Sequence, residues 1–323
     1  MLNWNAAKRG AVVVLALCLL SALSAFAAGP SAVWLKINPP NSPPAIGAMA
    51  MAYDPIGKKV VSFGGFNSTS YTSDTWLFDG NTWTQAVTED APSPRAAAAM
   101  AVDKVSGKLI LFGGFNGSQY LGDTWIWDGA AGTWTQANPT HVPTAVTLPM
   151  MFSDPINGHA EMFGGFDGNF FQEITWQWTG SDWMQRYSQN FPSARGAAVV
   201  SNDYAHKTVV IFGGLGDVNP NNTWTWDGHN WTQQTPATQP PLTYYSSAAF
   251  DPVLNEVIAF GGGFGTTTWA WTGNDWVTVP TFHAPSLRWS IGLAWDGASQ
   301  QLVMFGGENN TGLLDGTYKL VKR

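Results

Sequence analysis

Few side chains in this sequence have the type and spacing that chemistry requires. Its 323 residues include five histidines and one cysteine, and no two histidines lie at the spacing of metal ligands. Neither a Gly-x-Ser-x-Gly nucleophile motif nor a phosphate-binding glycine loop is present. We therefore expect no metal site, no cofactor and no assignable catalytic residue.

Three arginines are the residues best suited to recognise a ligand. Arg95, Arg195 and Arg288 each lie eight residues before an aspartate that recurs along the chain. Because a guanidinium fork matches a carboxylate, the three arginines predict an electropositive ring that binds an acidic sugar or a peptide carboxylate. In the alternative interpretation, each arginine bonds carbonyl oxygens or a neighbouring acid inside the fold.

Other candidate ligand-binding residues lie in segments whose length varies. From each Phe-Gly-Gly motif to the next strand's aromatic residue, the distances are 13, 13, 13, 12, 9 and 13 residues. Loops on a rigid scaffold concentrate binding residues, and the short fifth loop predicts a notch in the rim. The acidic and aromatic candidates in these loops are Tyr71, Tyr120, Asp167, Phe170, Phe171, Glu173, Asp217, Phe264 and Glu308.

A sixfold repeat determines the elements that position these residues. Phe-Gly-Gly begins at Phe63, Phe112, Phe163, Phe212, Phe260 and Phe305, with an aspartate nine residues before each phenylalanine and a tryptophan 29 residues before it. Fixed distances over six units indicate a repeat architecture. Each unit divides into four strands, with Asp-Gly turns between the third and fourth in several units. The pattern predicts an all-β, six-bladed β-propeller.

The two ends of the repeat predict how the ring closes. The sixth unit stops after its third strand, at 316–320, and lacks a fourth. Trp34 is an unmatched fourth-strand tryptophan, so residues 33–37 are expected to supply the outer strand of blade six. This pairing would leave no open sheet edge at the junction.

Most aspartates and tryptophans have structural roles in this interpretation. The six repeat aspartates occupy the turn after the first strand, where a carboxylate bonds local backbone N–H groups. Tryptophan pairs such as Trp125 and Trp127 alternate on one strand, and both faces of a blade are covered by neighbours. We therefore assign them to packing between blades. The Gly-Gly pairs are expected to permit close backbone approach.

The paired glycines, the third-strand aromatic and the fourth-strand tryptophan, in units of about 50 residues, resemble the kelch repeat family over residues 32–320. The resemblance implies the propeller fold of the galactose-oxidase-like superfamily, and arginines that often meet acidic ligand groups. Copper oxidases of this superfamily use a thioether between cysteine and tyrosine. Copper oxidase activity is not expected here, because the mature chain is predicted to lack cysteine.

The N-terminus has the features of a secretory signal peptide. Lys8 and Arg9 precede an apolar run from 11 to 23, and Ala25-Phe26-Ala27 provides a small-x-small cleavage pattern. Cleavage after Ala27 would remove Cys18 and export residues 28–323, a single propeller domain, to the periplasm or the medium. Lipidation of Cys18, or retention of the segment as an anchor, is the alternative.

Composition and loops together predict the function. With 11% charged residues and a net charge of −7, a nucleic acid is not an expected partner. We expect a monomeric, non-catalytic module that binds a protein or glycan through the face carrying the variable loops, with no stable membrane span after cleavage. The alternative is a metal-independent sugar epimerase or mutarotase, like the kelch-type sialate mutarotases, with an Arg/Glu site at the channel mouth. A structural propeller tethered to an envelope complex is the third possibility.

Overall fold

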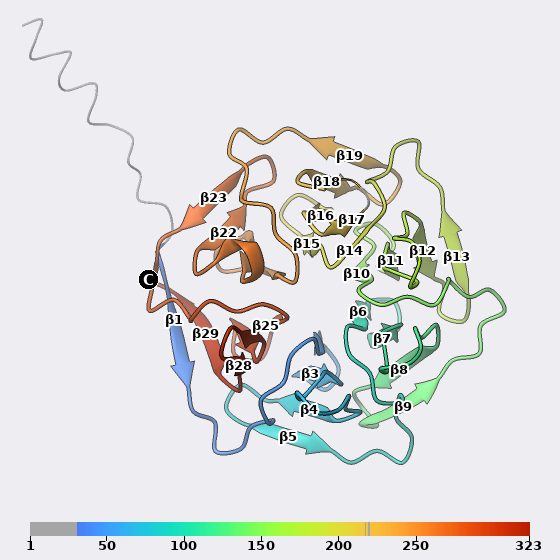
Figure 1. Ribbon diagram of the computed structural model, residues 1–323, viewed down its shortest axis with the longest axis horizontal. Helices are drawn as coiled ribbons and strands as arrows, with labels where there is room; N and C mark the ends of the chain where they lie inside the picture. Colours follow the sequence, from blue (N-terminus) through green and yellow to red (C-terminus); the bar gives the residue numbers. More distant parts are fainter. Residues whose placement is uncertain (1–30, 217, 219) are drawn as a thin grey trace, which may run out of the picture.

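Each repeat folds into a small antiparallel sheet, and six such sheets form a ring around a central axis (Figure 1). The computed structural model describes residues 31–216, 218 and 220–323. The predicted signal peptide and Cys18 lie outside the described residues. The six-bladed propeller predicted from the repeat is confirmed.

Blade one shows the pattern that the other blades follow. Its strands run from the axis outward as β2 (Ala50–Asp54), β3 (Lys59–Phe63), β4 (Thr75–Phe78) and β5 (Trp83–Ala86). The first strands of adjacent blades contact one another and surround the axis. Small residues suit this crowded position, whereas the second strands are almost wholly apolar and buried.

The next four blades have the same strand order. Their strands are β6 (Ala99–Asp103), β7 (Lys108–Phe112), β8 (Thr124–Asp128) and β9 (Thr133–Gln136); β10 (Met150–Ser153), β11 (Ala160–Phe163), β12 (Thr175–Trp178) and β13 (Trp183–Arg186); β15 (Val199–Asp203), β16 (Thr208–Phe212), β18 (Thr223–Trp226) and β19 (Trp231–Gln234); and β20 (Ser247–Asp251), β21 (Glu256–Phe260), β22 (Thr268–Trp271) and β23 (Trp276–Val279).

Blade six joins the two ends of the described chain. It contains β25 (Gly292–Asp296), β26 (Gln301–Phe305) and β29 (Thr317–Lys322), and its outer strand is β1 (Ala32–Ile37). β1 pairs antiparallel with β29, with Trp34 opposite Leu320, as the unmatched tryptophan predicted (Figure 1). A two-residue strand, β24 (Thr281–Phe282), adds to β1 in parallel, which the sequence did not indicate. It covers part of the edge that β1 would otherwise expose.

A ring of side-chain hydrogen bonds joins the blades near their outer edge. Each fourth-strand tryptophan donates its Nε1–H to the hydroxyl of the first threonine in the third strand of the preceding blade, at 2.8–3.1 Å. The six bonds run from Trp34 to Thr268, Trp83 to Thr317, Trp134 to Thr75, Trp183 to Thr124, Trp231 to Thr175 and Trp276 to Thr223.

A second ring, made of backbone atoms, surrounds the axis. In each blade, one residue just before the first strand has a φ between 53° and 58° and donates its N–H to the carbonyl of the equivalent residue in the preceding blade, at 2.8–3.1 Å. Left-handed backbone is costly for a residue with a side chain, so the inter-blade bonds must hold it in place. The six residues, here called the backbone ring, are Ala48, Ala97, Leu148, Ala197, Tyr245 and Ser290.

The Gly-Gly pairs allow the blades to approach closely, as expected. A Cβ atom on Gly64, which has a φ of +66°, would lie 2.5 Å from the carbonyl oxygen of Arg95 in the next blade. The following glycine, Gly65, donates its N–H to the same carbonyl at 2.8 Å. An equivalent bond joins each blade to the next at 2.8–2.9 Å, which completes a third ring.

The hydrophobic core consists of separate clusters between adjacent blades. One of them joins blades three and four and contains Phe163, Trp226 and Trp231. The third-strand tryptophans lie in these clusters, which confirms their packing role. The repeat aspartates are also structural: Asp54 is 2% exposed and accepts N–H bonds from Ile56 and Gly57. Within the described residues, no helix has the length and apolar character that a membrane span requires.

Candidate functional site

The three arginines are buried inside the blades, with 1%, 0% and 2% of Arg95, Arg195 and Arg288 exposed. Arg95 donates from Nε to the carbonyl of Ser93 and from Nη2 to its hydroxyl, both at 2.9 Å. Its Nη1 donates to the carbonyl of Gly113 at 3.2 Å. Arg195 and Arg288 make the same three contacts with the corresponding serines and glycines.

A fourth contact differs among the three arginines. Arg95 forms a bidentate pair with Asp123, with 2.8 Å between Nη2 and Oδ2. Burial acts to raise the pKa of Asp123, but the hydrogen bonds and charge of Arg95 outweigh it and hold that pKa below its usual value. Arg195 donates to the carbonyl of Pro220, and Arg288 to the hydroxyl of Tyr318.

These contacts correct the expectation of a ligand-binding arginine ring. The donors point at carbonyl, hydroxyl and carboxylate groups of the same blade, and the side chains lack the exposure that a docking carboxylate would need. The structural alternative, in which each arginine bonds carbonyl oxygens or an acid inside the fold, describes all three. Their role is to connect the link entering a blade with the Phe-Gly-Gly motif of that blade.

The variable loops of blades one to three form three similar hairpins. The loops between second and third strands, with the links that enter the first strands, make up one face of the propeller, here called the variable-loop face. Phe66 bridges Tyr71 in the first hairpin, and the same bridge recurs in the next two. Asn67 accepts N–H bonds from Thr69 and Ser70 across the turn. Asn116 and Asp167 occupy its position in blades two and three.

Asp167 is therefore a turn residue rather than a free ligand group. Its Oδ1 accepts from the backbone N–H groups of Asn169 and Phe170, both at 2.8 Å. The bonds from Phe170 and then Asn169 lower the pKa of Asp167. The carboxylate thus stabilises the hairpin in which the candidate aromatic residues lie.

Aromatic rings join the three hairpins into a continuous series, here called the aromatic ladder. Each hairpin contributes two rings, and the second ring of one hairpin contacts the first ring of the next. Successive ring centroids lie 4.9–5.9 Å apart. The ladder consists of Phe66, Tyr71, Phe115, Tyr120, Phe166 and Phe171.

The tyrosines of the ladder pack against glycines in the following hairpin. A Cβ on Gly117 would lie 2.8 Å from Tyr71, and a Cβ on Gly168 would lie 2.5 Å from Tyr120. Both glycines also have positive φ, at +99° and +101°. In blade one the equivalent position is Ser68, with a φ of 74°. The sequence contained a signal for this packing. Of the three hairpins, only those of blades two and three have a glycine directly after the turn Asn or Asp.

The remaining loop candidates differ in exposure. Phe170 is 67% exposed at a hairpin tip, Phe171 is half-buried in the ladder and Glu173 is exposed. Phe264 is 3% exposed and stacks on Phe212, with centroids 6.1 Å apart, so its assignment to the exposed surface is corrected. The shortened fifth loop turns back as a short 3₁₀ helix, η1 (Gly262–Phe264), which directs the ring into the interface with blade four. Asp217 lies outside the described residues.

The arginine–glutamate pair that sugar chemistry would need is not formed by Arg288 and Glu308. Arg288 donates to Ser286, Gly306 and Tyr318, whereas Glu308 accepts a 3.4 Å bond from Ser290. Glu308 belongs to a two-residue strand, β27 (Glu308–Asn309), which pairs with β28 (Gly312–Leu313) on this face. Over residues 31–216, 218 and 220–323, no three His, Cys, Asp or Glu side chains are grouped as metal ligands would be.

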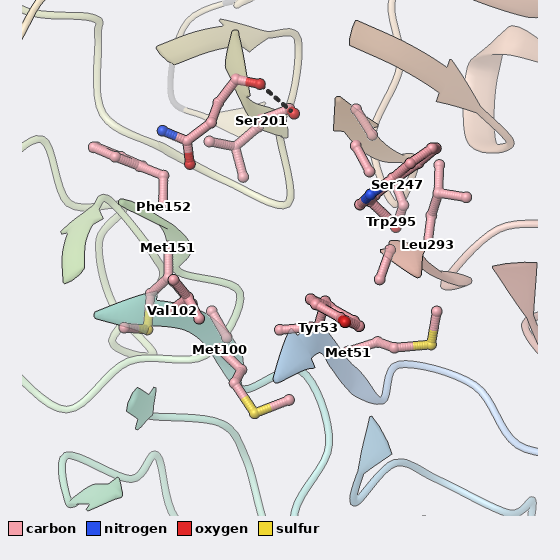
Figure 2. A pocket seen from close by; sticks show the side chains of 18 of the residues that line it. Met51, Tyr53, Met100, Val102, Met151, Phe152, Ser201, Ser247, Leu293 and Trp295 are labelled. Carbon is pink, nitrogen blue, oxygen red and sulfur yellow. Dashed lines mark hydrogen bonds between the residues drawn. The ribbon is translucent and has the colours of Figure 1, made fainter. Parts of the chain in front are cut away.

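The first strands surround a central cavity of about 600 Å³, shown in Figure 2. Methionines occupy the same strand position in blades one to three, as Met51, Met100 and Met151, and line the cavity. Aromatic side chains line the end that lies near the turns after the first strands. None of the candidate residues chosen from the sequence lines this cavity. The recurrence of methionine three residues before the repeat aspartate in blades one to three could have indicated it.

A buried polar cluster interrupts the apolar interface between blades three and four. Glu161, which is 0% exposed, occupies a second-strand position that is Val or Ile in the other five blades. Gln177 donates to Glu161 at 3.2 Å and to Asp154 at 3.3 Å. Arg186 lies 3.9 Å from Glu161 and 4.0 Å from Asp154, so one cation faces two carboxyl groups. Burial, followed by the charge of Asp154, raises the pKa of Glu161 to about 9.

These features define the class of protein, a six-bladed β-propeller built from repeated four-stranded blades. A family model described as the KLHDC2/KLHL20/DRC7 Kelch-repeats domain matches residues 30–177. With the six blades and their Phe-Gly-Gly motifs, this match supports a kelch-repeat β-propeller.

Comparison of structures supports the fold without selecting a function. A solved structure titled "Structure of YjhT" is similar to this chain with a TM-score of 0.68 and 16% sequence identity, over 88% of this chain and 99% of that one. In all, 503 solved chains match, so the propeller alone does not discriminate among functions. No curated protein sequence matches the chain.

Proposed function

We propose that the protein is an exported, monomeric, non-catalytic module that binds a protein partner through its variable-loop face. The observation that carries this proposal is the set of three hairpins fixed by the aromatic ladder. Their tips, 68–70, 117–119 and 168–170, are mostly exposed, and each tip is held by an Asn or Asp turn. A rigid, pre-organised surface loses little entropy when it binds.

The composition of the tips favours protein recognition. They present Ser, Thr, Gln, Asn and Gly beside half-buried Tyr and Phe side chains. The same mixture is typical of antibody binding loops, where aromatic rings supply rigid contact area and small polar residues supply adaptable hydrogen bonds. Phe170, at 67% exposure, has the character of an anchor that a partner would bury.

The geometry favours a protein over a glycan. Sugar rings stack on exposed aromatic surfaces, but Tyr71 is packed among Phe66, Phe115 and Gly117. Tyr120 is enclosed in the same way in the next blade. The ladder therefore supports the hairpins and leaves mainly their polar tips and Phe170 for contact.

A partner search with two matched variants tests the proposal. Proteins from the envelope and medium of the source cells would be captured quantitatively on wild-type protein, on Phe170→Asp and on Val105→Asp. Val105 is the control because it is 62% exposed on a turn at the opposite face. A purified partner should bind the Phe170→Asp variant at least about tenfold more weakly than wild type, and should bind Val105→Asp as tightly as wild type.

Three results would contradict this function. If no captured protein distinguishes the two variants, the variable-loop face is not a protein-binding surface. A glycan array and an acidic-sugar turnover screen on the same variants address the other classes. Glycan binding that depends on Phe170 would show that the partner class is wrong, and turnover of an acidic sugar would support the mutarotase alternative.

A further inference from the structure

The central cavity is a second site, separate from the variable-loop face. Its volume of about 600 Å³ falls within the range of small-molecule pockets. Its walls are mostly apolar and include the three equivalent methionines Met51, Met100 and Met151. Thioether side chains are flexible and polarisable, so such a wall adapts to apolar ligands of different shape.

The two ends of the cavity differ. At the variable-loop end, a smaller pocket of about 150 Å³ is lined by the six residues of the backbone ring. The hydrogen bonds that close this ring hold the blades together there. At the other end, the lining includes Tyr53, Phe250, Trp295 and Tyr204, together with the turn residues Pro55 and Pro252. We take this turn end, which holds the larger pocket and its aromatic lining, as the entrance for a ligand.

A single charged side chain lies at that entrance. Among the described residues that line the cavity, Lys104 is the only charged one. Its Nζ lies 3.9 Å from the centroid of the Tyr204 ring, a cation–π contact that holds the ammonium group beside the opening. The nearby repeat aspartates are buried and committed to their turns, as Asp103 is to the N–H groups of Val105 and Ser106. A positive group above an apolar interior is complementary to an amphiphilic anion.

We propose that the central cavity binds an amphiphilic carboxylate. The apolar body of the ligand lies among the methionines and aromatic rings, and its carboxylate lies at Lys104. The polar groups that line the cavity are largely hydrogen-bonded within the protein. Ser153, for example, donates to the carbonyl of Val102 at 2.7 Å. Ser201 likewise donates to the carbonyl of Asn202 at 3.0 Å (Figure 2). The interior therefore offers packing, and the charge at the mouth determines the orientation of the ligand.

Calorimetry with matched probes tests this site on the purified protein. Dodecanoate, dodecanol and dodecylammonium share an apolar chain and differ in head-group charge. We expect saturable one-to-one binding of dodecanoate, weaker binding of dodecanol and the weakest binding of dodecylammonium. Lys104→Gln should weaken dodecanoate about fivefold and leave dodecanol unchanged, because an ion pair at an exposed mouth contributes up to about 1 kcal/mol.

Two further variants separate charge from volume. Lys207→Gln removes an exposed lysine of an equivalent turn that is outside the cavity lining, and it should leave every affinity unchanged. Ala248→Phe places a ring in the cavity and should abolish binding of both dodecanoate and dodecanol. The proposal is wrong if wild-type protein shows no saturable binding at millimolar dodecanoate, or if Lys104→Gln and Lys207→Gln behave alike. Because Lys104 lies at the surface, its variant keeps the test decisive even if Ala248→Phe does not fold.

Discussion

Replacing Glu161 with glutamine should change how the stability of the protein depends on pH. In the folded protein this carboxyl group is buried beside Asp154, and its pKa is about 9 instead of 4.5. Between these two values the unfolded chain has released a proton that the folded chain retains. Stability contributed by this group is therefore present at low pH and is lost as the pH rises from about 4.5 to about 9.

The size of the effect follows from the same difference. Each pKa unit corresponds to about 1.4 kcal/mol, so up to about 4 kcal/mol would be lost between pH 5 and pH 8. The charge of Arg186 is already included in this pKa, whereas relaxation of the interface offsets part of the cost, and we expect about 2 kcal/mol. Glutamine cannot ionise but can still accept the bond from Gln177, so Glu161→Gln should remove this loss.

Thermal unfolding at several pH values measures the difference directly. At pH 5, Glu161→Gln and wild type should unfold within about 1 °C of each other. At pH 8, the variant should unfold about 4 °C higher, taking about 2 °C per kcal/mol for a chain of this size. Glu173→Gln, at an exposed loop position, is the control and should show no pH-dependent difference. An equal shift at both pH values, or a variant less stable at pH 8, would refute the proposed protonation of Glu161.

Three further substitutions test the ring and the hairpins. Trp34→Ala should destabilise the protein by about 3–5 kcal/mol in urea unfolding, because the side chain is 1% exposed and lies in the strand that closes the ring. Gly168→Ala should cost more than about 1 kcal/mol and weaken partner binding, because the new Cβ would meet Tyr120 at 2.5 Å; unchanged thermal stability would contradict the ladder. Arg95→Ala should cost about 3–5 kcal/mol in urea unfolding, because Asp123 would lose its bidentate cation and keep only the bond from Trp125.

The blades could be predicted because each signal acts locally. An aspartate bonds the turn two residues later, as Asp54 does, and an Asp-Gly pair turns a hairpin. Repeating such signals at constant distance leaves few alternatives for strand order. The closure by Trp34 could also be predicted, since one strand was missing at one end of the repeat and one was unmatched at the other.

The candidate site was predicted less well because its residues depend on partners distant in the chain. Whether an arginine at the position of Arg95 faces a ligand or the fold depends on Gly113 and Asp123, which reach it only when the blade has formed. Phe264 occupies a variable loop, but the shortened turn directs its ring onto Phe212. The spacing from which these residues were chosen as candidates predicts neither the burial of Arg95 nor that of Phe264.

The amino-acid sequence alone determined the number of blades, their strand order and the junction of the two ends, because each rests on short-range turn chemistry and on strand pairing in fixed register. The tertiary structure alone decided which side chains remain available to a ligand. Arg95, Glu161 and Phe264 are buried, whereas Phe170 and Lys104 stay accessible. Exposure depends on how neighbouring blades pack, and that packing exists only when the ring is closed.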